Sequence, residues 1–197
     1  MHDAMTDDII ARVKRILSER EVRVLSIQPN LTRAAVLVPL LCKEGSHHIL
    51  FTKRSESVRH HKGEISFPGG ARDASDADMM RTALREAYEE IGVREKDVEI
   101  LGRLDDVVTM SDYRVSPFVG VIPYPYALTP STDEIAELIF LPLKCFLKNG
   151  VLGEDFRTYG DRTEKVPIYH CGEHIIWGAT ARILRQFLEI IFTEELM

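Results

Sequence analysis

The stretch from Gly69 to Val93 constrains the fold more than any other part of the chain. It opens with a Gly-Gly pair and a loop that carries several acids, and it continues into a run that ends at Gly92. This run places apolar or aromatic residues at the spacing of one helix face. They are Ala83, Leu84, Ala87, Tyr88 and Ile91. We therefore expect a loop followed by a helix that turns this face toward a core.

The same run carries three glutamates on another side of the expected helix. At about 100° per residue, Glu86 and Glu90 stand one above the other, with Glu89 beside them. Arg85 can pair with Glu89, but like charges at this spacing still cost roughly 0.2 to 0.5 kcal/mol per pair. A hard divalent cation such as Mg²⁺ would turn that cost into a gain, because it takes oxygen ligands. A solvated acidic face is the alternative interpretation, and the glycines on both sides of the acids favour a metal site.

Residues 70–93 resemble the Nudix box, which reads Gly, five residues, Glu, seven residues, Arg-Glu-aliphatic-any-Glu-Glu-any-Gly-aliphatic. Residues 85–93 match its second half position by position. In the first half the acid is Asp76 instead of Glu, and eight residues separate it from Arg85. The extra residue fits in a loop that leads into a helix. The resemblance implies the Nudix-type α/β/α sandwich with a mixed β-sheet.

Residues 50–70 resemble a narrower signature, that of the coenzyme A pyrophosphatases of the Nudix superfamily. The pattern is Leu-Leu-Thr-any-Arg-Ser, three residues, Arg, three residues, Gly, three residues, Phe-Pro-Gly-Gly, and the chain departs from it only at Phe51. The matching residues are Leu50, Thr52, Arg54, Ser55, Arg59, Gly63, Phe67, Pro68, Gly69 and Gly70. This resemblance implies metal-dependent hydrolysis of the diphosphate of coenzyme A or acyl-coenzyme A, which gives 3′,5′-ADP and (acyl) 4′-phosphopantetheine.

Residues 53–62 are the most basic stretch of the chain and lie just ahead of the acidic helix. Phosphoryl chemistry needs such a pairing, since a metal neutralises the bridging oxygens while arginines bind the outer phosphates in a fork. We expect Lys53, Arg54 and Arg59 to bind the substrate. A solvated loop is the alternative, and it is the favoured interpretation for His60 and His61.

The resemblance also implies roles for residues of the box. The Gly69 carbonyl, Glu86, Glu89 and Glu90 are expected to hold one to three Mg²⁺ or Mn²⁺ ions. Glu89 is expected to orient or deprotonate the attacking water, and Arg85 to support it, although the roles within the glutamate trio stay interchangeable at this point.

A further acid outside the box often completes such sites, as a metal ligand or a base. The candidates are Glu134, Glu137 and the loop at residues 109–112. Glu134 ranks slightly above Glu137, and surface charge is the alternative for both.

The length, composition and net charge of the chain limit which molecules it is expected to bind. The chain has 197 residues, 45% of them hydrophobic, which suits one Nudix hydrolase domain over residues 1–197 with a substantial core. A net charge of −6 and a pI near 5.7 argue against binding of nucleic acid by general phosphate neutralisation. We expect a small-molecule nucleoside diphosphate substrate, similar to coenzyme A, and the sequence leaves a homodimer open.

The three cysteines are Cys42, Cys145 and Cys171. They are scattered, odd in number and without CxxC spacing, so we expect neither a disulfide framework nor a zinc site. A reducing, cytoplasmic setting fits this pattern. The acidic N-terminus lacks the layout of a secretion signal, and no apolar run approaches 18 residues, so we expect no membrane segment.

Periodicity and turn residues predict the other elements. An apolar stripe predicts a helix within residues 1–20, and a second one predicts a closing helix from residue 178. Strands are expected at residues 34–41, 48–52, 98–102, 107–108, 113–123, 134–143, 156–159, 166–170 and 174–177. These elements form a mixed sheet between helices, in agreement with the resemblance.

Two other functions stay open from the sequence. One is hydrolysis of another nucleoside diphosphate derivative, such as ADP-ribose, a dinucleotide or a noncanonical triphosphate. The other is a catalytically silent Nudix domain that binds a nucleotide. The intact trio Glu86, Glu89 and Glu90 counts against silence, because a pure binding protein gains little from three crowded acids.

Overall fold

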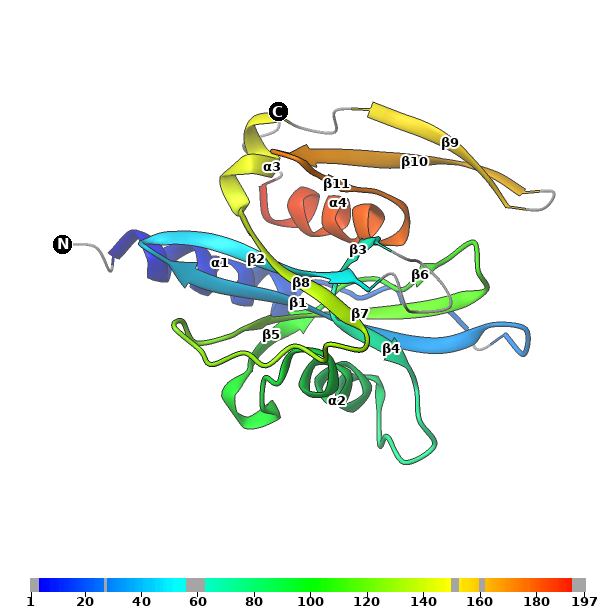
Figure 1. The fold of residues 1–197 in the computed structure, drawn as a ribbon, viewed down its shortest axis with the longest axis horizontal. Helices are drawn as coiled ribbons and strands as arrows, with labels where there is room; N and C mark the ends of the chain where they lie inside the picture. Colours follow the sequence, from blue (N-terminus) through cyan, green and yellow to red (C-terminus); the bar gives the residue numbers. More distant parts are fainter. Residues whose placement is uncertain (1–3, 27, 56–62, 150–152, 160–161, 193–197) are drawn as a thin grey trace.

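The computed structural model describes residues 4–26, 28–55, 63–149, 153–159 and 162–192 (Figure 1). Its helices are α1 (Ala4–Glu19), α2 (Met79–Ile91), α3 (Leu143–Asn149), α4 (Gly178–Phe192) and the short 3₁₀ helix η1 (Glu95–Asp97). Its strands are β1 (Thr32–Lys43), β2 (Ser46–Arg54), β3 (Ile65–Ser66), β4 (Gly69–Ala71), β5 (Glu99–Arg103), β6 (Val107–Val108), β7 (Tyr113–Val121), β8 (Ile135–Pro142), β9 (Gly153–Tyr159), β10 (Arg162–Cys171) and β11 (His174–Ile176).

Eight of the strands form one mixed sheet. The order is β3-β2-β1-β7-β5, and in addition β4 pairs with β1, β6 with β7, and β8 with β2. The central strands β1 and β7 run parallel over nine residue pairs, from Thr32 opposite Tyr113 to Leu40 opposite Val121. The other pairs in this sheet are antiparallel.

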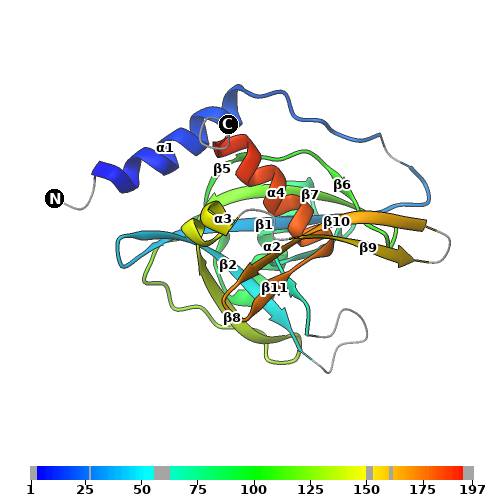
Figure 2. The same ribbon diagram turned by 90° about the horizontal axis from the view of Figure 1, so that it is seen from above.

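Helices cover both faces of this sheet, and β1 shows why. Ala35, Leu37 and Leu41 pack with residues of α2, whereas Val38 and Leu40 belong to the larger core that includes α1 and α4. This alternation follows from the two-residue period of a strand, which is buried on both sides here. Figure 1 shows α2 on one face and α4 on the other, and in Figure 2 the N-terminal end of α1 projects from the body. The expected sandwich with a mixed sheet is confirmed.

A second sheet of three antiparallel strands, in the order β11-β10-β9, packs against α4 and α3. It contains the predicted hairpin, although residues 160–161 at its turn lie outside the described part of the chain. Cys145 of α3 and Cys171 of β10 form a disulfide there. The expectation of no disulfide is therefore wrong for this pair, because the packing of α3 on β10 brings together cysteines that are 26 residues apart in sequence. Within the described residues, no helix has the length and apolar character needed to cross a membrane.

Candidate active site

Helix α2 has clear start and stop signals. The Asp78 carboxylate accepts a hydrogen bond from the Arg81 N–H at 2.9 Å, which caps the N-terminus. Gly92 ends the helix in the left-handed conformation, with φ of 73°, and its N–H bonds the Tyr88 carbonyl. The helix between them is regular, so the extra residue of the box does not rotate the glutamates apart.

The Gly-Gly pair lies against the glutamate side of α2. The sequence predicts a loop here, but these residues form the short strand β4, which pairs with β1. The Gly69 N–H donates to Glu90 Oε2 at 3.2 Å. A side chain at Gly70 would put its Cβ 2.4 Å from Glu86 Oε2. A side chain at position 70 would therefore have to displace the Glu86 carboxylate.

Glu90 and Glu86 are the acids that the fold withdraws from solvent. Glu90 is only 4% exposed, and burial raises its pKa to about 7, against the Gly69 N–H and the charge of Arg54. Arg54 Nη1 lies 3.6 Å from Glu90 Oε1. Burial also raises the pKa of Glu86. The charged forms of both carboxylates are thus destabilised by desolvation, and a nearby cation would stabilise them.

Glu89 is different, because its side chain is 54% exposed. It accepts a hydrogen bond from Arg85 Nη1 at 2.9 Å, so the predicted ion pair is confirmed. The same guanidinium donates to Glu86 Oε1 at 2.9 Å and to the Ala71 carbonyl at 3.1 Å. Arg85 therefore links two of the glutamates to β4.

Asp76 is the anchor of the loop between β4 and α2. It receives hydrogen bonds from Arg85 Nε and Nη2, both at 3.0 Å, and from the Thr82 hydroxyl at 2.9 Å. The hydrogen bonds from Arg85 hold its pKa down at about 2. The aspartate at this box position thus fixes the loop to the helix through Arg85.

Glu134 and Glu137, the candidate acids outside the box, have different surroundings. The charge of Glu134 contributes to the raised pKa of both Glu86 and Glu90, so its carboxylate lies within electrostatic reach of them. Its carbonyl accepts the Ser55 N–H at 2.7 Å, which ties it to the end of β2. Glu137 lies farther along β8, opposite Lys53 of β2.

The remaining candidates are the loop at residues 109–112 and the basic residues Lys53, Arg54 and Arg59. The loop at residues 109–112 closes the turn between β6 and β7, where Thr109 Oγ1 accepts the Tyr113 N–H at 3.0 Å. Lys53 and Arg54 are described, whereas Arg59 and its histidine neighbours lie outside the described residues.

A hard divalent cation fits these donors chemically. In the described part of the chain, no three His, Cys, Asp or Glu side chains stand in the arrangement of a formed metal site. Arg85 instead engages Glu86 and Glu89. The candidate metal ligands are the Gly69 carbonyl and the carboxylates of Glu86 and Glu90, which are all oxygen ligands. Burial disfavours the charged form of both carboxylates when no cation is near.

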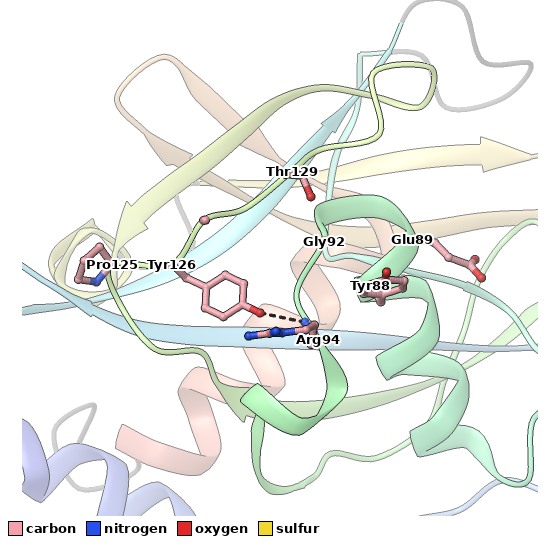
Figure 3. Close-up of a pocket in the computed structure, with 8 residues that line it drawn as sticks. Tyr88, Glu89, Gly92, Arg94, Pro125, Tyr126 and Thr129 are labelled. Carbon is pink, nitrogen blue, oxygen red and sulfur yellow. Dashed lines mark hydrogen bonds between the residues drawn. The ribbon is translucent and has the colours of Figure 1, made fainter.

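An open cavity of about 690 Å³ adjoins the C-terminal end of α2 (Figure 3). The loop on its far side is held to the helix by the Thr129 N–H on the Ile91 carbonyl and the Ser131 N–H on the Glu90 carbonyl. Tyr88 is 56% exposed on this side, so its assignment to the buried stripe is wrong. The apolar residues that α2 buries are Met79, Ala83, Leu84, Ala87 and Ile91, and Tyr88 lies beyond their arc on the helix. The cavity is lined by Tyr88, Glu89, Gly92, Arg94, Pro125, Tyr126, Ala127 and Thr129.

Comparison with known proteins agrees with this geometry. A NUDIX domain model matches residues 31–151. The chain is 36% identical over 170 residues to the peroxisomal coenzyme A diphosphatase NUDT7 of Mus musculus, covering 86% of this chain and 69% of that protein. It is 34% identical over 186 residues to the uncharacterized Nudix hydrolase NudL of Enterobacter sp. (strain 638), covering 94% of each.

Among solved structures, the MutT/nudix family protein from Enterococcus faecalis has a TM-score of 0.55 at 14% identity. The match covers 97% of this chain and 74% of that chain, and it is a likeness of fold. The fold likeness shows the architecture alone, whereas the family model and the sequence relatives identify the family. The chain belongs to the Nudix hydrolase family.

Proposed function

We propose that this protein hydrolyses the diphosphate of coenzyme A or acyl-coenzyme A, with Mg²⁺ or Mn²⁺ as cofactor. Nudix hydrolases generally use divalent metal ions. The proposal rests mainly on one contact between residues of the two signatures. Arg54 Nη1 of the coenzyme A-type signature lies 3.6 Å from Glu90 Oε1 of the box. The 36% identity to a coenzyme A diphosphatase supports the choice of substrate.

Each residue of the site has a distinct part in this reaction. Glu86 and Glu90, with the Gly69 carbonyl, would hold the metal, and Glu89 would be the third acid of the site. When bound, the metal acidifies a water molecule and stabilises charge on the leaving phosphate. Arg54 is proposed to contact a phosphate oxygen, and Lys53 and Arg59 are proposed to contribute further positive charge.

Attack by the water forms a new P–O bond, and the bridging oxygen leaves with the electron pair of the bond that breaks. A carboxylate accepts the proton of the water. We assign this step to Glu89, which Arg85 holds in place at 2.9 Å, with Glu134 as the second acid at the site. The products are 3′,5′-ADP and (acyl) 4′-phosphopantetheine.

Parallel hydrolysis assays test the substrate. Coenzyme A, acetyl-coenzyme A, ADP-ribose and NADH are each incubated with the protein and Mg²⁺ or Mn²⁺, and products are separated by chromatography. We expect the coenzyme A compounds to give the highest kcat/KM. Faster turnover of ADP-ribose or NADH would reject the coenzyme A proposal and keep the hydrolase, and turnover of none would favour a nucleotide-binding domain. A cytoplasmic location, a homodimer and the lack of a nucleic-acid partner stay predictions.

A further inference from the structure

Four arginines gather on the α2 face of the main sheet, and we call Arg33, Arg72, Arg103 and Arg114 the arginine cluster. Arg33 of β1 is directly opposite Arg114 of β7, and the Arg72 N–H bonds the Arg33 carbonyl at 2.8 Å. Three arginines thus stand side by side on neighbouring strands. Arg103 of β5 is the fourth, and after burial the charges of the other three lower the pKa of Arg33. Like charges directly opposite one another destabilise a sheet.

Strand alternation places the arginine cluster on the same sheet face as Glu86. Ala35 and Phe118 pack against α2, and residues two apart on a strand share a face. Arg33 therefore lies on the face of Ala35, just beyond the N-terminal end of α2. Gly70 pairs with Ala35 and would touch Glu86 through a Cβ. At about 3.3 Å per residue and 4.8 Å between strands, the Cα atoms of Arg33 and Gly70 are roughly 8 Å apart.

The existing contacts leave donors of the arginine cluster without acceptors. Arg114 Nη1 donates to the Leu25 carbonyl at 2.5 Å, and Arg72 Nη2 donates to the Asp76 carbonyl at 2.6 Å. The Nε atoms of all four arginines are buried and have no hydrogen-bond partner among the described residues. Arg114 itself is only 4% exposed. Buried donors without acceptors are rare in folded proteins and commonly indicate an ion or water that completes the site.

The charge of Asp106 opposes this excess of positive charge at Arg33. The buried Asp106 accepts hydrogen bonds from Arg103 and from the Ser116 hydroxyl, and its Oδ2 lies 3.8 Å from Arg114 Nε. Of the acids nearby, Asp76 is bound by Arg85, and Asp105 is bound by Arg20. The charge of Asp106 by itself cannot neutralise four guanidinium groups, and the N-terminal end of α2 adds further positive potential.

We propose that the arginine cluster is a phosphate-binding site, separate from the glutamates that act on the diphosphate. Several guanidinium groups on one sheet face match the oxygens of a phosphate better than those of a single carboxylate. The phosphate has two sources with the same chemistry. It is either free inorganic phosphate or a phosphate monoester that the substrate carries away from its diphosphate, such as the 3′-phosphate of coenzyme A; this second source rests on the proposed function.

Thermal unfolding with inorganic phosphate tests the site without any substrate. The wild type, Arg33→Gln and Arg15→Gln are compared in metal-free buffer, in phosphate and in chloride of equal ionic strength. Arg15 is the matched control, because it is an arginine whose side chain is 63% exposed on α1. We expect phosphate to raise the Tm of the wild type and of Arg15→Gln, and Arg33→Gln to bind phosphate about tenfold more weakly.

The behaviour in chloride distinguishes a binding site from a structural role. Removing one charge from the arginine cluster relieves repulsion, so Arg33→Gln is expected to have a Tm equal to or above that of the wild type in chloride. A phosphate shift in Arg33→Gln as large as in the wild type, or no shift in the wild type, would overturn the proposal.

Kinetics then identify the source of the phosphate. If the substrate supplies it, Arg33→Gln raises the KM for coenzyme A about tenfold and leaves the KM for coenzyme A lacking the 3′-phosphate unchanged. If both KM values stay unchanged while the Tm difference persists, free phosphate is the ligand. If neither compound is hydrolysed, the proposed function fails, whereas the Tm comparison still decides whether the arginine cluster binds phosphate.

Discussion

The glutamates of α2 and the arginine cluster share one face of the main sheet but carry opposite charge. Glu90 has Arg54 as a cationic neighbour at 3.6 Å, and its carboxyl stays buried with a raised pKa. The arginine cluster has Asp106 as its buried acid and keeps four Nε donors without acceptors among the described residues. In both regions the fold forces like charges together before any ligand arrives. The difference indicates that one region is suited to a cation and the other to an anion.

The largest effect is expected from Glu90→Gln, which removes a charge from the acidic region alone. We expect kcat to fall on the order of 10²- to 10³-fold, because the proposed metal site would lose its most buried carboxylate. The Tm should stay the same or rise, since a buried charge is lost. Kinetics with Mg²⁺ and thermal unfolding measure both effects, with Glu99→Gln as the exposed control on β5. Full activity of Glu90→Gln would remove the distinction between the two regions.

Gly70→Ala tests whether the acidic region depends on close packing. The added methyl group would sit 2.4 Å from Glu86 Oε2 and must displace that carboxylate. A displacement of about 1 Å is expected to lower kcat roughly 10²-fold. Gly153→Ala is the control, because its Cβ would meet no atom within 4 Å. Equal kcat values for the two variants would show that the position of Glu86 does not matter.

Asp76→Asn tests the residue that lies between the two regions, since its carboxylate binds Arg85 and its carbonyl binds Arg72. The folded-state pKa of Asp76 is lowered to about 2, so its charge stabilises the fold above the unfolded pKa and loses this effect as the pH falls through about 2. We expect Asp76→Asn to reduce the free energy of unfolding by about 2 kcal/mol at pH 7.

Urea unfolding between pH 7 and pH 2.5 measures that difference. The stability gap between Asp76→Asn and the wild type should shrink as the pH falls below about 4. A gap that is constant over this range would mean that shape, and not charge, anchors the loop.

The smallest effect is expected from Glu134→Gln, at the rim of the acidic region. We expect kcat to fall about tenfold, as for a residue that supports the metal or the attacking water from its periphery. Glu137→Gln is the matched control three residues later on β8, opposite Lys53. The pH profiles of kcat for the two variants show which of these two acids affects the reaction. A larger loss in Glu137→Gln would reverse the order of these two acids.

The acidic region is largely readable from the sequence, because its residues are neighbours in the chain. The helical spacing of Glu86, Glu89 and Glu90 and the stop at Gly92 predict α2, and the four-residue step from Arg85 predicts its ion pair. The mixed sheet between helices is also predicted, since strand and helix periods differ along the chain.

The rest depends on pairing between distant segments. Arg33, Arg72, Arg103 and Arg114 come together only through the register of β4, β1, β7 and β5, and no local pattern fixes that register. The pairing that makes β4 from the Gly-Gly pair has the same origin. The disulfide between Cys145 and Cys171 follows from how α3 packs on β10, and Tyr88 is exposed because it lies beyond the buried face of α2.

Residues 129–134 cross the C-terminal end of α2, and we call them the strap. The strap couples the positions of two acids that are distant in sequence, Glu90 and Glu134. The last carbonyls of a helix have no partner within the helix. Here the Ser131 N–H donates to the Glu90 carbonyl, and the Glu134 N–H donates to the Ser131 carbonyl. A shift of this strap would therefore move Glu134 and the backbone of Glu90 together. Evolution or design can alter residues 123–128 to reshape the adjoining cavity, while a change of length close to Ser131 would move Glu134 and Glu90, the residues of the proposed active site.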